Sequence, residues 1–213
     1  VLKAFIDNGV SESSFAGSTG YGYGDRGRDA LDEILADIMG AEDALIRRSI
    51  VSGTHAITIA LFGILRPGDT LLAATGAPYD TLEKVIGHTS PSAGSLAEYG
   101  VSYEQVDLVT GTETPDLEGI QEALKANPTI KMVHIQRSRG YNTRPSLSIE
   151  WIEKIIKAVR EIRSDVVVFV DNCYGEFTED REPTDVGADV FVGSMMKNLG
   201  AGFAVSGAYC VGR

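Results

Sequence analysis

The segment VVVFVDNCYGEF, residues 166–177, decides the fold class of this chain. It begins with five consecutive apolar residues, four valines and a phenylalanine. Short runs of this kind are typical of strands buried on both faces, as in parallel sheets covered by helices. Asp171 follows the run directly, so the strand delivers a carboxylate to the edge of the sheet, where ionisation is costly without a cationic partner. A carboxylate that caps the next turn is the alternative interpretation.

Strand and helix patterns alternate along the rest of the chain. Apolar or alternating runs predict six further strands, at residues 42–49, 69–75, 101–108, 130–136, 189–194 and 207–212. Helical spacing predicts five helices, at residues 29–40, 53–65, 79–87, 114–125 and 148–162. Thr114 and Ser148 are the expected N-caps of the last two. We therefore expect one α/β domain over residues 29–213, with a mostly parallel seven-stranded sheet and helices on both faces.

Residues 1–28 are rich in glycine and serine, and their apolar residues follow neither helical nor strand spacing. We therefore expect an extended arm or loop. Residues 22–27, GYGDRG, match the G-x-G-x-x-G pattern, but no strand pattern precedes them, and a dinucleotide site is therefore rejected. The chain begins with Val1 and ends at Arg213, just after a predicted strand, so we expect it to be a piece of a longer protein.

The composition limits the partners that this chain can have. Its 30 acidic and 19 basic side chains give a formal net charge of −11, which would repel nucleic acids and anionic lipids. No apolar run is long enough to cross a bilayer, and the first residues do not resemble a secretory signal. The two cysteines, Cys173 and Cys210, have neither metal-binding nor disulfide spacing. We expect a cytosolic protein without a metal site.

Two further segments place polar residues beside predicted strand ends. Ser52, Gly53 and Thr54 open an apolar helix after a strand, and the free N–H groups of such a turn, together with the helix dipole, can bind a phosphate. A plain serine or threonine N-cap is the alternative. Lys197 lies in ADVFVGSMMKNLGAGFAVSG, residues 188–207, three residues after Ser194. Apolar surroundings would lower its pKa and favour Schiff-base chemistry, although the side chain could instead extend to water.

These features together are the parts that pyridoxal phosphate requires. An anion site suits its phosphate, a carboxylate suits its pyridinium nitrogen and a lysine suits its aldehyde. The order along the chain, phosphate turn, Asp171 and then Lys197, is that of the fold-type I pyridoxal-phosphate enzymes.

Three blocks of sequence resemble one family within that group, the methionine gamma-lyase-like proteins, also known as aluminium resistance proteins. They are residues 21–57 (YGYGDRGRDALDEILADIMGAEDALIRRSIVSGTHAI), residues 65–87 (LRPGDTLLAATGAPYDTLEKVIG) and residues 170–177 (VDNCYGEF). The resemblance covers almost the whole chain. It implies the large domain of a fold-type I enzyme, a homodimer or homotetramer with active sites at the subunit interface, and cleavage of carbon–sulfur bonds.

The resemblance also implies residue roles. Lys197 would bind the aldehyde of pyridoxal phosphate and later move protons, and Asp171 would keep the ring nitrogen protonated. Gly53 and Thr54, helped by Ser52 and Ser194, would hold the phosphate. Tyr79 would stack on the ring, with a half-buried core tyrosine as the alternative. Tyr23 and Arg26 would reach the phosphate of a neighbouring subunit, although their spacing departs from the family's Tyr-x-Arg.

Other candidates remain open from the residues alone. His55 could stack on the ring or be structural, and Arg137 and Arg139 could bind a carboxylate or phosphate or lie in a solvated loop. We interpret His88 and His134 as structural, and Cys173 as a packing residue rather than a persulfide carrier.

The reaction also remains open. Elimination at the β-carbon or the γ-carbon would use the same residues, and an aminotransferase or desulfurase could share them. The arginine that binds the substrate carboxylate is expected in a smaller C-terminal domain that these residues do not include. An α/β binding domain without catalysis is the alternative of another class.

Overall fold

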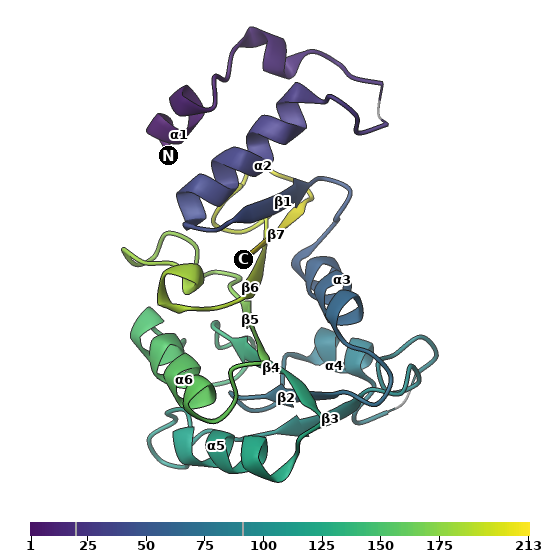
Figure 1. Ribbon diagram of the computed structural model, residues 1–213, viewed down its shortest axis with the longest axis vertical. Helices are drawn as coiled ribbons and strands as arrows, with labels where there is room; N and C mark the ends of the chain where they lie inside the picture. Colours follow the sequence, from purple (N-terminus) through teal and green to yellow (C-terminus); the bar gives the residue numbers. More distant parts are fainter. Residues whose placement is uncertain (20, 91) are drawn as a thin grey trace.

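The computed structural model describes residues 1–19, 21–90 and 92–213, and Gly20 of the predicted arm therefore lies outside the described residues. Seven strands in this part of the chain form one sheet, in the order β1-β7-β6-β5-β4-β2-β3 (Figure 1). Strand β7 runs antiparallel to both of its neighbours, and the other paired strands are parallel. The strands are β1 Asp43–Arg47, β2 Thr70–Ala73, β3 Ser102–Gln105, β4 Ile130–Gln136, β5 Val167–Asp171, β6 Val190–Ser194 and β7 Ala208–Gly212.

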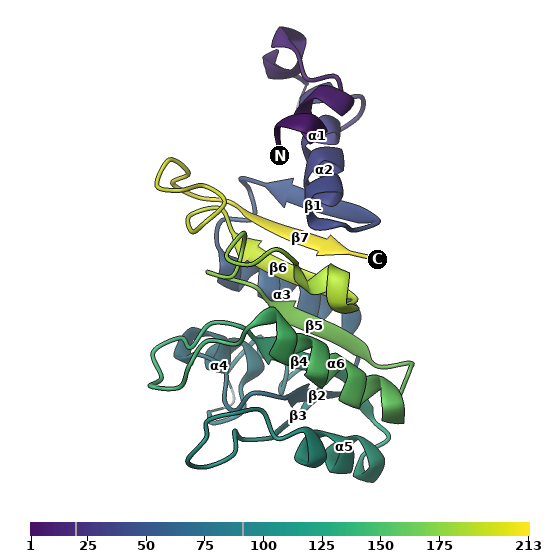
Figure 2. The same ribbon diagram turned by 90° about the vertical axis from the view of Figure 1, so that its left-hand side faces the viewer.

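Helices cover both faces of this sheet, as Figure 2 shows for α6 in front of it and α3 behind it. One face packs against α2, α5 and α6, and the other against α3 and α4. The helices are α1 Leu2–Asp7, α2 Arg26–Met39, α3 Gly53–Ile64, α4 Asp80–Ile86, α5 Leu117–Ala126 and α6 Ile149–Ile162, with short 3-10 helices η1 Glu12–Phe15 and η2 Pro183–Val186. The predicted mostly parallel, doubly covered α/β sheet is confirmed.

Helix α6 shows how the sequence pattern produces this packing. Ser148 caps it as predicted, because its side chain accepts a hydrogen bond from the Trp151 N–H. The predicted stripe faces the core, with Ile152, Ile155 and Val159 fully buried. Burying each such side chain contributes about 1.5–3 kcal/mol.

Two local predictions are wrong. Residues 1–28 are not an extended loop throughout, because α1 and η1 form within them and α2 already begins at Arg26. The missed signal is Asp25, whose carboxylate accepts a hydrogen bond from the Arg28 N–H and so starts α2 three residues before the predicted helix. Helix α5 is capped by Asp116 rather than Thr114, since the Asp116 carboxylate accepts the Gly119 N–H at 2.9 Å.

Within the described ranges, no helix combines the length and the apolarity that crossing a bilayer requires.

His134 on β4 is a buried core residue, in agreement with its structural interpretation. Its ring stacks on Phe169 with 5.7 Å between the centroids, and its Nε2 atom has no hydrogen-bond partner. Burial, assisted by the nearby charge of Arg144, lowers the pKa of His134 from 6.5 to about 4. Below pH 6.5 the unfolded chain therefore binds a proton at His134 that the folded state does not bind. The free energy of unfolding is highest above that pH and decreases as the pH falls towards 4.

We expect this histidine to cost roughly 2 kcal/mol of the free energy of unfolding between pH 7 and pH 5. The variant His134→Phe keeps the ring contact but cannot bind the proton. Its free energy of unfolding should therefore fall by roughly 2 kcal/mol less than that of the original protein between pH 7 and pH 5. Urea unfolding at both pH values measures this difference. Buried carboxyls with raised pKa, such as Glu176, act in the opposite direction but are common to both proteins, so the difference isolates His134. Equal losses in the two proteins would contradict the assignment.

Candidate active site

A cavity of about 300 Å³ lies where the carboxyl ends of β4, β5 and β6 meet the first turns of α3 and α4. Ligand sites of α/β sheets are found at this end of the strands. Lys197, Asp171 and Tyr79, which the sequence places far apart, all contribute to its wall. The full lining is Thr54, Tyr79, Thr81, Ser138, Gly140, Tyr141, Asp171, Cys173, Tyr174 and Lys197.

Asp171 is the last residue of β5, and its register places it between two strands that also end at the cavity. It pairs with Gln136 of β4 and with Val192 of β6, and it is 2 % exposed. Burial raises the pKa of its carboxyl, and hydrogen bonds with Cys173 and the charge of Lys197 act against this. One of these bonds joins the Cys173 N–H to the Asp171 Oδ1 at 3.1 Å. Asp171 is therefore a buried acid that needs a cation to remain ionised.

Lys197 lies in the turn after β6, three residues beyond its last residue, Ser194. Its N–H donates to the Ser194 carbonyl at 3.2 Å. Its Nζ atom lies 4.2 Å from the centroid of the Tyr174 ring. The turn thus aims the amine back over the end of the sheet, towards the segment that carries Asp171.

The expected lowering of the Lys197 pKa is wrong for this structure. Burial does lower it, but interactions with Cys173, and then with Asp171 and Tyr174, oppose burial and raise the pKa above that of a free lysine. Burial and the adjacent carboxylate also raise the pKa of the Cys173 thiol. Lys197 is therefore an ammonium that the groups around it stabilise.

Cys173 connects the amine, the acid and the first turn of α3. Its thiol interacts with both Asp171 and Lys197. A Cβ atom added to Gly53 would lie 2.9 Å from the Cys173 Sγ and 3.4 Å from the Ser194 Cβ. The backbone of α3 can approach β5 and β6 this closely only because residue 53 is a glycine.

The first turn of α3 combines a capped terminus with a side chain that faces the cavity. The Ser52 Oγ accepts a hydrogen bond from the His55 N–H at 3.2 Å, so the alternative reading of Ser52 as an N-cap is correct. The hydroxyls of Thr54 and Tyr79 lie 2.9 Å apart and hydrogen-bond to each other. The Tyr79 N–H in turn donates to the Gln136 Oε1 at 3.0 Å, which fixes this tyrosine relative to β4. Burial raises the pKa of the Tyr79 phenol.

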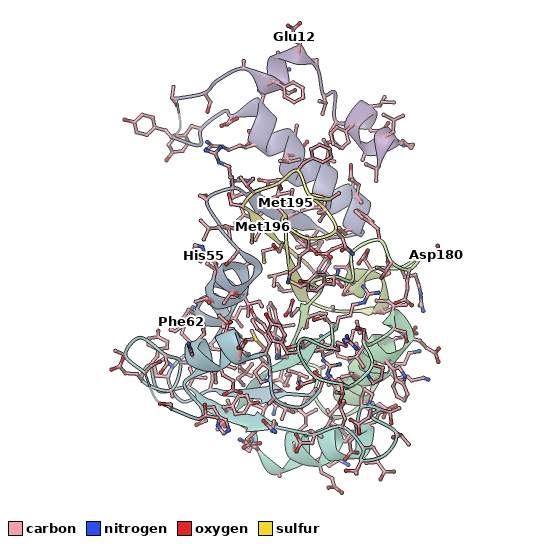
Figure 3. All side chains as sticks on the ribbon, turned by 180° about the vertical axis from the view of Figure 1, so that it is seen from behind. Glu12, His55, Phe62, Asp180, Met195 and Met196 are labelled. Atoms are coloured by element: carbon pink, nitrogen blue, oxygen red, sulfur yellow. The ribbon has the colours of Figure 1, made fainter. Side chains whose placement is uncertain are left out.

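Several sequence-predicted residues do not line the cavity. The buried Ser194 hydroxyl accepts the Met196 N–H at 3.2 Å, directly behind the lysine turn. Tyr23 and Arg26 are exposed on the arm and at the start of α2, away from this chain's own cavity. His55 is exposed on the outer side of α3 (Figure 3). Their predicted roles towards a cofactor stay predictions.

The two arginines after β4 have different surroundings. Arg139 is exposed, whereas Arg137 is 3 % exposed and belongs to a buried polar network rather than to a solvated loop or a ligand site. The Arg137 guanidinium donates to the Asn172 Oδ1 at 2.8 Å and to the Glu179 Oε1 at 2.6 Å. Asn172 also donates to Glu182 at 3.0 Å, so the network holds the turn that follows Asp171. His88, interpreted as structural, packs against the Tyr103 ring with 4.4 Å between the centroids.

Sequence reasoning missed the role of Tyr174 in the lining of the cavity and of Asn198 beside it. The available signal was position, because Tyr174 follows Asp171 by three residues and Asn198 is the neighbour of Lys197. The Asn198 side chain donates to the carbonyls of Tyr174 and Glu176 at 3.1 and 2.9 Å. It thereby ties the turn after β5 to the turn after β6.

Comparison with known proteins gives matches along the whole chain. The family model of methionine gamma-lyase matches residues 1–213. The chain is 50% identical to the protein YnbB of Bacillus subtilis (strain 168), described as uncharacterized, over 100% of this chain and 50% of that protein. It is 28% identical to the L-methionine gamma-lyase of Pseudomonas putida over 85% of this chain and 39% of the enzyme.

Solved structures agree with this result. A carbon-sulfur lyase involved in aluminum resistance from Clostridium novyi NT superposes with a TM-score of 0.95 and 51% identity, over 99% of this chain and 50% of that one. The chain thus spans about half the length of the proteins it matches. The predicted fold class, the large domain of the fold-type I enzymes, is confirmed. With a family model matched from the first residue to the last, this chain belongs to the methionine gamma-lyase family.

Proposed function

We propose that the protein is a pyridoxal-phosphate-dependent carbon–sulfur lyase that acts on a sulfur-containing amino acid. The observation that carries the proposal is the convergence of Lys197 and Asp171 on one cavity, with Cys173 between them in its wall. The printed names of the relatives support the reaction class, because they include an L-methionine gamma-lyase and a carbon-sulfur lyase.

The residues of the cavity fit pyridoxal phosphate in size and in chemistry. About 300 Å³ is at the lower end of the range for small-molecule sites. The N–H groups of Gly53 and Thr54 at the start of α3 would bind the phosphate, and the N-cap Ser52 and the buried Ser194 would support the two turns beside it. Tyr79 would cover one face of the ring. Asp171 would pair with the ring nitrogen, which supplies the cation that this buried carboxylate requires.

The cofactor, when bound, supplies an electron sink for charge that develops at the substrate α-carbon. Lys197 would hold the aldehyde and, once the substrate amine has displaced it, would carry protons at the α-carbon as general base and acid. The base must first lose its own proton. Pairing of Asp171 with the ring nitrogen would offset one of the interactions that raise the Lys197 pKa, which favours that loss.

The test is an assay of the full-length protein with methionine, cystathionine and cysteine. A lyase should release a keto acid together with a thiol from at least one of them without a second substrate. A keto acid that forms only when a second keto acid is added would favour an aminotransferase. Absence of both products, from a protein that shows no visible absorbance, would favour the non-catalytic binding domain.

The close approach at Gly53 gives a second test of the phosphate turn. Gly53→Ala should weaken the binding of pyridoxal phosphate about tenfold, because its Cβ would displace either Cys173 or the first turn of α3. The matched control is Gly63→Ala in the same helix, where nothing lies within 4 Å of the added Cβ. It should keep the affinity and raise the free energy of unfolding by about 0.5–1 kcal/mol. Titration by absorbance gives the affinity, and equal affinities of the two variants would contradict the assignment.

We further propose that the protein is a cytosolic homodimer or homotetramer whose active sites lie at the subunit interface. The exposed apolar side chains of the arm, including Leu2, Ile6 and Phe15, support an oligomer, and Tyr23 and Arg26 would extend from it to the neighbouring phosphate. Both cysteines are free thiols, as suits a reducing compartment. Sedimentation of the full-length protein as a monomer would contradict the oligomer.

A further inference from the structure

Tyr174 has an unusual backbone conformation beside the cavity. Its φ angle is 70°, in the left-handed region that side chains with a Cβ atom disfavour. Its side chain is 60% exposed, so burial of the ring does not compensate for this conformation. What the ring does contact is the ammonium of Lys197, which lies 4.2 Å from its centroid.

The surrounding contacts show what maintains this conformation. Asn198, next to Lys197, donates to the carbonyls of Tyr174 and Glu176. Glu176 is itself fixed, because its buried carboxyl accepts the Tyr209 hydroxyl at 2.8 Å. On the other side, Asn172 is held by Arg137 and Glu182. The turn is thus fastened at both ends, and the aromatic ring cannot leave Lys197 without breaking these bonds or changing its rotamer.

We propose that Tyr174 is a positioning residue, which holds the Lys197 ammonium against the face of its ring at the wall of the cavity. A lysine has four rotatable bonds and loses considerable entropy when its amine is fixed. The negative face of an aromatic ring attracts an ammonium within about 6 Å of its centroid, which confines the amine without removing it from the cavity. The aldehyde of a ligand would then meet an amine whose position is already set.

The other groups around the amine do not confine it in this way. Asp171, at the end of β5, and Cys173, in the turn after it, face Lys197, and Glu176 is a further acid on the same turn. Tyr79 and Tyr141 line the same cavity. Among these, Tyr174 is the residue whose ring lies under the ammonium. Its removal should therefore change the state of the amine while Asp171 and Cys173 remain in place.

A role of this contact in catalysis rests on the proposed function, but the test of the contact itself does not depend on that function. The full-length protein is treated with hydroxylamine to remove any bound aldehyde, and its lysines are then labelled competitively with acetic anhydride over an alkaline pH series. The mass of the peptide that contains residue 197 gives the pKa and the intrinsic reactivity of that amine. Loss of the proposed lyase activity would leave this measurement unaffected, so the two hypotheses fail independently.

Tyr174→Leu should lower the Lys197 pKa by about half a unit, and so raise the neutral fraction about threefold below the pKa. Tyr174→Phe keeps the ring and should retain the original pKa. The matched control is Phe177→Leu, since Phe177 is also partly exposed, at 49%, and also has a positive φ of 59°, in the same turn. It should leave the pKa unchanged. An unchanged pKa in Tyr174→Leu, or the same shift in Phe177→Leu, would overturn the proposal.

Discussion

Replacing Lys197 with alanine should abolish the covalent attachment of pyridoxal phosphate and lower the rate of thiol release by about a thousandfold or more. The physical reason is that one amine performs two tasks, holding the aldehyde and carrying the proton at the α-carbon. In the described part of the chain, Lys197 is the lysine that lines the cavity. The folded state should persist, because the side chain is only partly buried.

The control for this variant is Lys154→Ala. Lys154 also places its ammonium over an aromatic ring, 4.5 Å from the centroid of Trp151, but it lies on the surface of α6. Its removal should leave the absorbance and the rate of thiol release unchanged. Activity retained in Lys197→Ala, or lost to the same degree in Lys154→Ala, would contradict the role of Lys197.

Replacing Asp171 with asparagine should lower the rate by about a hundredfold or more without destabilising the fold. The amide cannot supply the negative charge that keeps a pyridinium nitrogen protonated. Loss of a fixed charge of this kind typically lowers the rate of an enzyme by about a hundredfold or more. The Asn Oδ1 can still accept the Cys173 N–H. Because burial raises the pKa of Asp171, its charge opposes folding at neutral pH, and the free energy of unfolding should stay equal or increase.

Activity assays and urea unfolding of Asp171→Asn measure these two effects separately. Asp116→Asn provides the control, because Asp116 caps α5 through the same kind of carboxylate contact and does not line the cavity. We expect no change of rate in that variant. If Asp171→Asn unfolds the protein while keeping its rate per folded molecule, Asp171 is only a turn cap, which is the alternative reading of the sequence.

The apolar runs predicted the sheet well because each strand carries its own signal. Residues 166–171 and 189–194 became β5 and β6 almost without change, and Asp171 lies at the strand end where the pattern placed it. The covering helices followed from helical spacing in the same way. The arm was predicted less well because α1 and η1 are short and mostly exposed, so their sequences contain no amphipathic pattern to detect.

The chemistry of the site depended on distances that a sequence does not contain. The pKa of Lys197 was predicted with the wrong sign because burial was foreseen, but the proximity of Cys173, Asp171 and Tyr174 to the amine was not weighed against it. Arg137 follows a strand, as a ligand-binding residue would, yet its guanidinium turns towards Glu179 and Glu182. Neither partner is close to it in sequence. The position of Tyr174 under Lys197 is a tertiary contact of the same kind.

The most direct measurement of the central claim is borohydride reduction of the full-length protein in the presence of pyridoxal phosphate, followed by peptide mass mapping. The account predicts that the visible absorbance disappears and that the mass of the reduced cofactor is found on Lys197, and that both effects vanish in Lys197→Ala. A label on another lysine, or a protein that remains colourless and unlabelled after the cofactor has been added, would contradict it.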